Sequence, residues 1–226
     1  MGSETMIRFI YLGNLLIEKG PLILLEACRI LKGRNIPFHC DLVGAPTAEI
    51  TLHAVQALAQ EYHLDGFVTI HGAQYGKAKE QLLKQADVMV FPTYYHNECF
   101  PLVLLEGMKQ GLALVSTKEG AIPDIIRDGE TGLLIEKQNP QSLALAMEKL
   151  ATIPGLAARL AAAGTQLYEQ CYSESVFISR MMGILKNSCP PLITSLTNTN
   201  GIPNEKSGAG CSVSSGSLPQ GDKVNT

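Results

Sequence analysis

The stretch ADVMVFPTYYHNECFPLVLLEGMKQGLALVS, residues 86–116, decides the fold of this chain. Residues 87–91 form a short apolar run closed by Pro92, which is typical of a buried parallel strand. Pro101 suits the first position of a helix, because its fixed φ is already helical, and it introduces an apolar segment. Ligands of open α/β sheets bind at the carboxyl ends of the strands, so the polar loop at residues 93–98 is the predicted site.

Two acids, Glu98 in this loop and Glu106 in the predicted helix, are separated by seven residues. The N–H groups of Leu102 and Val103 should point out of the helix start, where the helix dipole favours a phosphate. Glu106 lies about one turn further along, and its two oxygens can accept both hydroxyls of a ribose. The spacing alone leaves an ordinary alternative open, in which Glu106 extends to solvent and Glu98 is a loop acid near a helix start.

The rest of the chain alternates between strand-like apolar runs and amphipathic segments. The predicted strands are residues 7–12, 38–43, 67–71, 87–91 and 112–116, and the predicted helices are residues 21–32, 49–62, 77–85, a helix from Pro101, 140–150, 154–171 and 173–185. This alternation predicts an α/β domain with a mainly parallel sheet. From Asn187 the chain is rich in Pro, Ser, Thr, Asn and Gly, so residues 187–226 are expected to form a disordered tail.

Composition excludes several classes of protein. The 226 residues are 46% hydrophobic and 17% charged, which is typical of a globular protein, and the net charge of -3 gives no basic surface for nucleic acid. We find neither a run long enough to span a bilayer nor a signal peptide, so a cytoplasmic location is expected. The six cysteines form no Cys-x-x-Cys pair and the histidines show no ligand spacing, so no metal site is predicted.

Four blocks of sequence resemble the signature of the family 4 retaining glycosyltransferases, which have the GT-B fold. The blocks are ECFPLVLLE at 98–106, GLALVS at 111–116, GAIPD at 120–124 and DGETG at 128–132. In this order they resemble the C-terminal, nucleotide-sugar-binding domain of these enzymes, which is a Rossmann-like three-layer α/β/α domain. The resemblance implies such a domain over residues 6–186, and it implies that the N-terminal acceptor domain is absent from this chain.

The resemblance also implies roles for particular residues. Glu98 would face the sugar, Glu106 the ribose, and Lys19 with the amides of Leu102 and Val103 the diphosphate. Glu98 and Lys19 are thereby the candidate catalytic residues. The residues that the resemblance places in the sugar-donor site are Gly13, Asn14, Lys19, Phe100, Leu102, Val103, Glu106 and Gly120. It also places the loop at residues 72–76 against the nucleotide base, where Tyr75 is a candidate for stacking.

The activity implied is transfer of a hexose from a UDP-, GDP- or ADP-sugar to a glycan, lipid or other acceptor, as in polysaccharide biosynthesis. No metal or other cofactor is expected, and peripheral association with the inner face of the membrane is compatible with such an acceptor. Without the N-terminal domain, we expect the chain to be inactive. The alternative is a non-catalytic domain for nucleotide-sugar binding or protein interaction. An NAD-dependent oxidoreductase is disfavoured, because no Gly-x-Gly-x-x-Gly follows the first strand.

Overall fold

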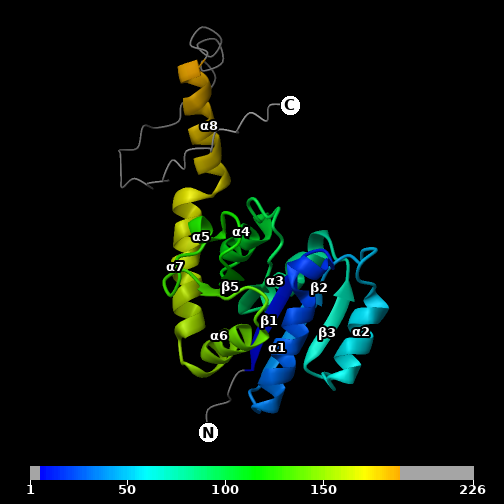
Figure 1. Ribbon diagram of the computed structural model, residues 1–226. Helices are drawn as coiled ribbons and strands as arrows, with labels where there is room; N and C mark the ends of the chain where they lie inside the picture. Colours follow the sequence, from blue (N-terminus) through cyan, green and yellow to red (C-terminus); the bar gives the residue numbers. More distant parts are fainter. Residues whose placement is uncertain (1–5, 189–226) are drawn as a thin grey trace, which may run out of the picture. The chain divides into compact units, whose positions relative to one another are not determined.

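The computed structural model describes residues 6–188, in which a parallel sheet is covered by helices (Figure 1). The elements are β1 (Ile7–Leu12), the 3-10 helix η1 (Ile17–Lys19), α1 (Pro21–Gly33), β2 (Phe38–Val43), α2 (Leu52–Glu61), β3 (Val68–Gly72), α3 (Gly76–Gln85), β4 (Val88–Phe91), α4 (Leu102–Lys109), β5 (Ala113–Thr117), α5 (Ile122–Ile125), β6 (Leu133–Ile135), α6 (Pro140–Thr152), α7 (Leu156–Cys171) and α8 (Glu174–Ser188).

The chain divides into two compact units, and the boundary lies between Phe177 and Ile178. The first unit contains the whole sheet and every residue of the predicted site. Within the second unit, the described residues belong to the remainder of α8, which ends at Ser188. The helix therefore extends two residues past the predicted start of the disordered tail, and the rest of that tail, residues 189–226, lies outside the described residues.

The sheet contains six strands in the order β3-β2-β1-β4-β5-β6, and all of its pairings are parallel. This confirms the predicted three-layer α/β class. α1 packs against α6, and α4 packs against α7. The chain adds strands in one direction from β1 to β3 and in the opposite direction from β4 to β6. Because crossovers between parallel strands are right-handed, this reversal places the two helix pairs on opposite faces of the sheet.

The adjacent strands β4 and β5 are buried along their whole length. β1, which pairs with β4, contributes Phe9 and Tyr11, which are fully buried together with Phe38 of β2 and Phe91 of β4. Burying an apolar side chain of this size stabilises the fold by about 1.5–3 kcal/mol. The strands whose ends carry the predicted site are thus the best-anchored part of the sheet.

The order of the strands reverses between β1 and β4. The two strands are neighbours in the sheet, although 75 residues lie between Leu12, the last residue of β1, and Val88, the first residue of β4. In open α/β sheets, ligands bind beside the loops that leave the carboxyl ends of two such strands, where the strand order reverses. Those loops are residues 13–16 with η1, and residues 92–101. They contain the predicted residues Lys19 and Glu98.

Three short elements occur where the sequence analysis predicts neither a strand nor a helix, and one of them is the three-residue strand β6. The segment before Gly20 contains the single-turn helix η1, and the segment after Gly120 contains the four-residue helix α5. Neither is long enough to show an apolar period of 3.6 residues, which is the signal on which helix prediction rests. The remaining predicted strands and helices are confirmed, with ends that differ by a few residues.

Candidate functional site

The loops after β1, β4 and β5 are joined by hydrogen bonds at the carboxyl edge of the sheet. The N–H of Tyr94 donates to the carbonyl oxygen of Glu18 at 2.7 Å, which connects the loop after β4 to η1. At the end of β5, the hydroxyl of Thr117 donates to the carbonyl oxygen of Thr93 at 2.5 Å. The three loops therefore hold one another in place within the protein itself.

Two glycines allow these loops to approach closely. Gly20 has a φ of 80°, and a Cβ at this position would lie 2.3 Å from the carbonyl oxygen of Pro92. Gly120 has a φ of 50°, and a Cβ there would lie 1.7 Å from the carbonyl oxygen of Glu98. Any side chain at either position would push two loops apart. Gly120, predicted to lie in the sugar-donor site, is thus packed directly against the backbone of the Glu98 loop.

The two candidate catalytic residues, Lys19 and Glu98, form an ion pair between the loops. The Nζ atom of Lys19 lies 5.0 Å from the ring centroid of Tyr95 and 5.3 Å from that of Phe91, within the range of cation–π attraction. Glu98 is only 8% exposed. A cation and a carboxylate are therefore held together at a site with little water, where charges interact more strongly than in bulk solvent.

Tyr11 supports the turn after β1 from below. Burial raises the pKa of its phenol well above the ordinary value, and the negative charge of Glu98 raises it further. The neutral hydroxyl donates to the carbonyl oxygen of Asn14 at 3.1 Å. Gly13 lies over the same ring, because a Cβ there would be 3.2 Å from the Tyr11 hydroxyl oxygen. The path of the turn that carries Gly13 and Asn14 is thus fixed by a buried phenol.

The helix α4 begins one residue later than predicted, and its start presents the amides of Leu102 and Val103, as expected. Pro101 is the N-cap residue rather than the first helical residue, because its ψ of 104° is extended. The first hydrogen bond of the helix runs from the N–H of Leu104 to the Pro101 carbonyl oxygen, at 3.1 Å. The N–H groups of Leu102 and Val103 precede this bond and are directed out of the helix start, where the macrodipole favours an anion.

A cavity of about 170 Å³, which we call the strand-end cavity, opens beside α4. It is lined by Leu12, Gly13, Asn14, Val43, Gly44, Ala45, Ala73, Gln74, Tyr75, Lys79, Val103 and Glu106. These residues come from the carboxyl ends of β1, β2 and β3 and from α3 and α4. The predicted residues Gly13, Asn14, Val103 and Glu106 are thereby brought to one cavity, with Tyr75, whose side chain is largely exposed, at its edge.

Glu106 has a partner that sequence reasoning missed. Its Oε2 accepts a hydrogen bond from the Nζ of Lys79, a residue of α3, at 2.6 Å. Lys79 lies 27 residues before Glu106, in the predicted helix at residues 77–85, to which no functional role was assigned. No local spacing links the two residues, and only the packing of α3 beside α4 brings them together.

Phe100 lies apart from the residues that line the strand-end cavity. Its ring centroid is 6.0 Å from that of Tyr172, which caps the end of α7, and 40% of the residue is exposed. Apart from Leu102, which is 66% exposed at the start of α4, the predicted residues thus fall into three groups. Lys19, Glu98 and Gly120 lie between the loops, Gly13, Asn14, Val103 and Glu106 line the cavity, and Phe100 packs on the side of α7.

A separate cluster of charged side chains lies on the sheet itself. Asp41 of β2 is 2% exposed, accepts a hydrogen bond from Arg8 at 2.9 Å, and lies 2.7 Å from the Nε2 of His71. Burial by itself would raise the pKa of Asp41, but the hydrogen bonds with His71 and Arg8 lower it below its ordinary value. This cluster joins β1, β2 and β3 and does not line the strand-end cavity.

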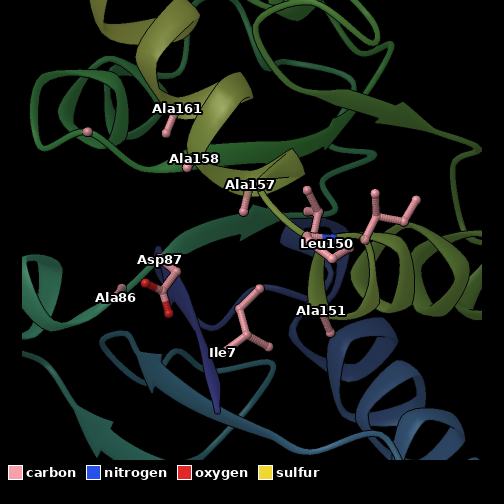
Figure 2. A pocket seen from close by; sticks show the side chains of 12 residues that line it. Ile7, Ala86, Asp87, Leu150, Ala151, Ala157, Ala158 and Ala161 are labelled. Carbon is pink, nitrogen blue, oxygen red and sulfur yellow. The ribbon is translucent and has the colours of Figure 1, made fainter. Parts of the chain in front are cut away.

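Another cavity, of about 450 Å³, opens at the opposite edge of the sheet (Figure 2). Ile7, Ala86 and Asp87 mark the amino ends of β1 and β4, and alanines from α6 and α7 form much of the remaining wall. Asp87 is its one titratable side chain, and that carboxylate accepts a hydrogen bond from the Arg8 amide at 2.8 Å. With its acid already engaged, this cavity offers little chemistry.

Within residues 6–188, no set of three or more His, Cys, Asp or Glu side chains is placed to hold a metal ion. None of the helices in the same range combines the length and the apolar character needed to cross a membrane.

The family is decided by the sequence around this site. Residues 3–167 match the protein family described as Glycosyl transferases group 1. The chain belongs to this family. Among curated relatives, it is 27% identical over 151 residues to a putative colanic acid biosynthesis glycosyltransferase WcaL of Salmonella typhimurium, covering 65% of this chain and 36% of the relative. It is 31% identical over 157 residues to a D-inositol 3-phosphate glycosyltransferase of Actinosynnema mirum, covering 67% of this chain and 37% of the relative.

The chain thus spans about a third of the length of these curated relatives. Solved structures place the fold among GT-B glycosyltransferases. The C-terminal domain of the group 1 protein LpcC from Francisella tularensis matches with a TM-score of 0.66 and 25% identity, covering 74% of this chain and 87% of that domain. Anabaena Alr3699/HepE in complex with UDP matches with a TM-score of 0.72 and 19% identity, covering 80% of this chain and 49% of that one.

Proposed function

We propose that this chain is the C-terminal, sugar-donor-binding half of a family 4 retaining glycosyltransferase with the GT-B fold. It would bind a nucleotide-diphosphate sugar, from which a hexose is transferred to a glycan or lipid acceptor. The observation that carries the proposal is the placement of two acidic sites on either side of the α4 start. Glu98 lies with Lys19 between the loops, and Glu106 lies in the strand-end cavity.

Each part of the sugar donor has a matching group. The Glu106 carboxylate can accept the ribose hydroxyls, since both of its oxygens have lone pairs to offer. The amides of Leu102 and Val103 lie about one helical turn from Glu106 and would take the diphosphate, together with the ammonium of Lys19. Glu98 would then face the sugar.

The reaction needs charge stabilisation more than a covalent intermediate. The bond from the anomeric carbon to the β-phosphate oxygen breaks and the electron pair leaves with the nucleoside diphosphate. The acceptor oxygen bonds to that carbon on the same face, and its proton passes to the departing diphosphate oxygen. Lys19 and the helix start would stabilise the negative charge that develops on the diphosphate. These groups provide that stabilisation from the protein itself, and we propose transfer without a metal ion.

Two of the relatives indicate what the whole protein could act on. One is named for colanic acid biosynthesis and one for D-inositol 3-phosphate, and a structural neighbour was solved with UDP. We propose by analogy a role in polysaccharide or glycolipid biosynthesis at the cytoplasmic face of the membrane. The 226 residues by themselves are expected to bind the sugar donor without transferring it, and an N-terminal acceptor-binding half would complete the enzyme.

Calorimetric titration of the purified chain with UDP, GDP and ADP tests the proposal. Selective binding of one nucleotide, lost in Glu106→Ala and kept in Glu169→Ala, is expected. Glu169 is a matched control because it is an exposed helical glutamate outside the cavity. If a folded chain binds none of the three, the sugar-donor site is refuted.

Turnover experiments test the remaining steps. Transfer is expected only after an N-terminal half from a relative is added, and NMR of the product should show the anomeric configuration of the sugar donor. Inversion would refute the retaining assignment. Selective nucleotide binding that no added half converts to transfer would favour the alternative, a non-catalytic nucleotide-sugar-binding domain.

A further inference from the structure

Lys79 is the one positively charged residue that lines the strand-end cavity, and its ammonium group forms an ion pair with Glu106. The two are the only charged side chains among the residues that line the cavity. Lys79 lies on α3 and Glu106 on α4, with 2.6 Å between Nζ and Oε2. The contact therefore joins α3 to α4 at the wall of the cavity.

The ion pair is poorly suited to a purely structural role. The side chains of Lys79 and Glu106 are 27% and 40% exposed, and pairs exposed to this extent contribute little to stability. What the contact does supply is orientation, because a free glutamate side chain samples several rotamers and loses that freedom when it is paired. A carboxylate fixed in advance does not have to be ordered by its ligand.

The geometry leaves Glu106 able to bind a ligand while Lys79 holds it. A carboxylate has about four lone-pair positions, and the contact with Lys79 uses one of them at Oε2. Both positions on Oε1 and one on Oε2 remain. That is enough for the two neighbouring hydroxyls of a ribose, each of which donates one hydrogen bond.

The size and the other walls of the cavity indicate which part of a ligand enters it. At about 170 Å³ it is smaller than the ~300–1,000 Å³ of pockets that hold whole small molecules, so it suits the nucleoside part of a nucleotide. Much of the wall is small or backbone, including Gly13, Gly44 and Ala73. Gln74 is engaged with its own loop, since its Nε2 donates to the His71 carbonyl oxygen at 3.1 Å.

We propose that Lys79 is a positioning residue that orients the Glu106 carboxylate toward the ribose hydroxyls and so makes the site selective for ribonucleotides over their dideoxy forms. The inference rests on the proposed function and adds to it a residue outside the four sequence blocks. Lys79 acts through Glu106 and not by contact with the sugar donor.

The test compares each nucleoside diphosphate with its 2′,3′-dideoxy analogue by calorimetry, using whichever of UDP, GDP and ADP the wild-type chain binds most tightly. Lys79→Met should weaken binding of the ribose form by up to about tenfold, which is the cost of ordering the Glu106 side chain on binding, and should leave the dideoxy form within about twofold of wild type. Lys79→Arg should recover most of the loss. Lys84→Met removes an exposed lysine from the same helix and should behave as wild type.

Lys79→Gln provides a second neutral variant, and thermal unfolding of all variants checks that each is folded. An equal loss for ribose and dideoxy forms would overturn the inference, because Lys79 would then contact another part of the ligand. So would an unchanged affinity for both. A wild-type chain that binds no nucleotide overturns the proposed function and the inference together, whereas selectivity that depends on Glu106 but not on Lys79 overturns the inference alone.

Discussion

Lys19 and Glu98, which are 79 positions apart in the sequence, form an ion pair where the loop after β1 meets the loop after β4. Their side chains are 18% and 9% exposed, so each would be left largely buried without the other. The two residues that resemblance assigns to the sugar and the diphosphate are therefore in direct contact with each other.

Removing one member of this pair should destabilise the protein. We expect Lys19→Met and Glu98→Gln each to lower the free energy of unfolding by about 2 kcal/mol, because an unpaired charge remains in a mostly buried site. The double variant should lose clearly less than the sum. Urea denaturation measures all three, and additive losses would show that the two residues do not interact. The more exposed pair of Lys137 and Glu119 is the control, with an expected cost below about 1 kcal/mol.

Gly120 should tolerate no side chain. In Gly120→Ala, the new methyl group would overlap the Glu98 carbonyl oxygen, and the φ of 50° adds backbone strain. We expect a loss of about 2–4 kcal/mol in the free energy of unfolding. Gly129→Ala is the matched control, because its φ of 75° is also positive but no atom lies within 4 Å of the added Cβ. That variant should lose only about 1 kcal/mol, and equal losses for the two would mean that the contact with the Glu98 loop is unimportant.

Tyr11 should remain un-ionised in the folded protein at alkaline pH. Its folded pKa is raised, so the stability that it contributes is fully present below its ordinary pKa of 10.0 and is lost as pH rises above that value. Tyr11→Phe should cost about 1 kcal/mol at neutral pH, since it removes the hydrogen bond to Asn14, and should flatten the decline above pH 10. Denaturation at a series of pH values tests this. Tyr75→Phe, at a position 77% exposed, should change neither quantity.

The stability that Asp41 contributes should depend on pH in the opposite direction to that of Tyr11. Its folded pKa is lowered, so its stabilising effect is present above the ordinary value of 3.8 and is lost as pH falls below it. Asp41→Asn should cost about 3 kcal/mol at neutral pH, because Arg8 and His71 lose a buried anionic partner. The difference from wild type should shrink as the solution is acidified below pH 3.8. A difference that is constant with pH would contradict the assigned ionisation, and Asp65→Asn, at an exposed turn, serves as control.

The fold was predictable from sequence because the strands and long helices are marked by local patterns. The apolar run at residues 87–91 favours burial in any surrounding structure, and residues Val88 to Phe91 are indeed fully buried. The helix α5 was not predictable in this way, because four residues with a central proline show no period. Pro101 was placed one position too far into α4, since its fixed φ does not determine its ψ.

The candidate site was predictable only where its residues stand in recognisable blocks. Glu98 and Glu106 share one block, and Lys19 was found through the turn after the first strand. Lys79 was missed because the contact that gives it a role depends on how α3 lies beside α4, which no spacing within either helix encodes. The contact of Gly120 with the Glu98 backbone was also missed, because it depends on how the loop after β5 packs against the loop after β4.

The hydrogen bonds between the loops bear on how fast a ligand can bind. The sheet pairing continues beyond the strands, since the N–H groups of Gly13 and Leu15 donate to the carbonyl oxygens of Val43 and Ala45 at 3.1 and 2.8 Å. Because the Tyr94 amide is bonded to the Glu18 carbonyl oxygen, the loop after β4 is fixed in the same way. Nucleotide association should therefore proceed in a single kinetic phase whose rate is proportional to ligand concentration, without a slower step in which a loop becomes ordered.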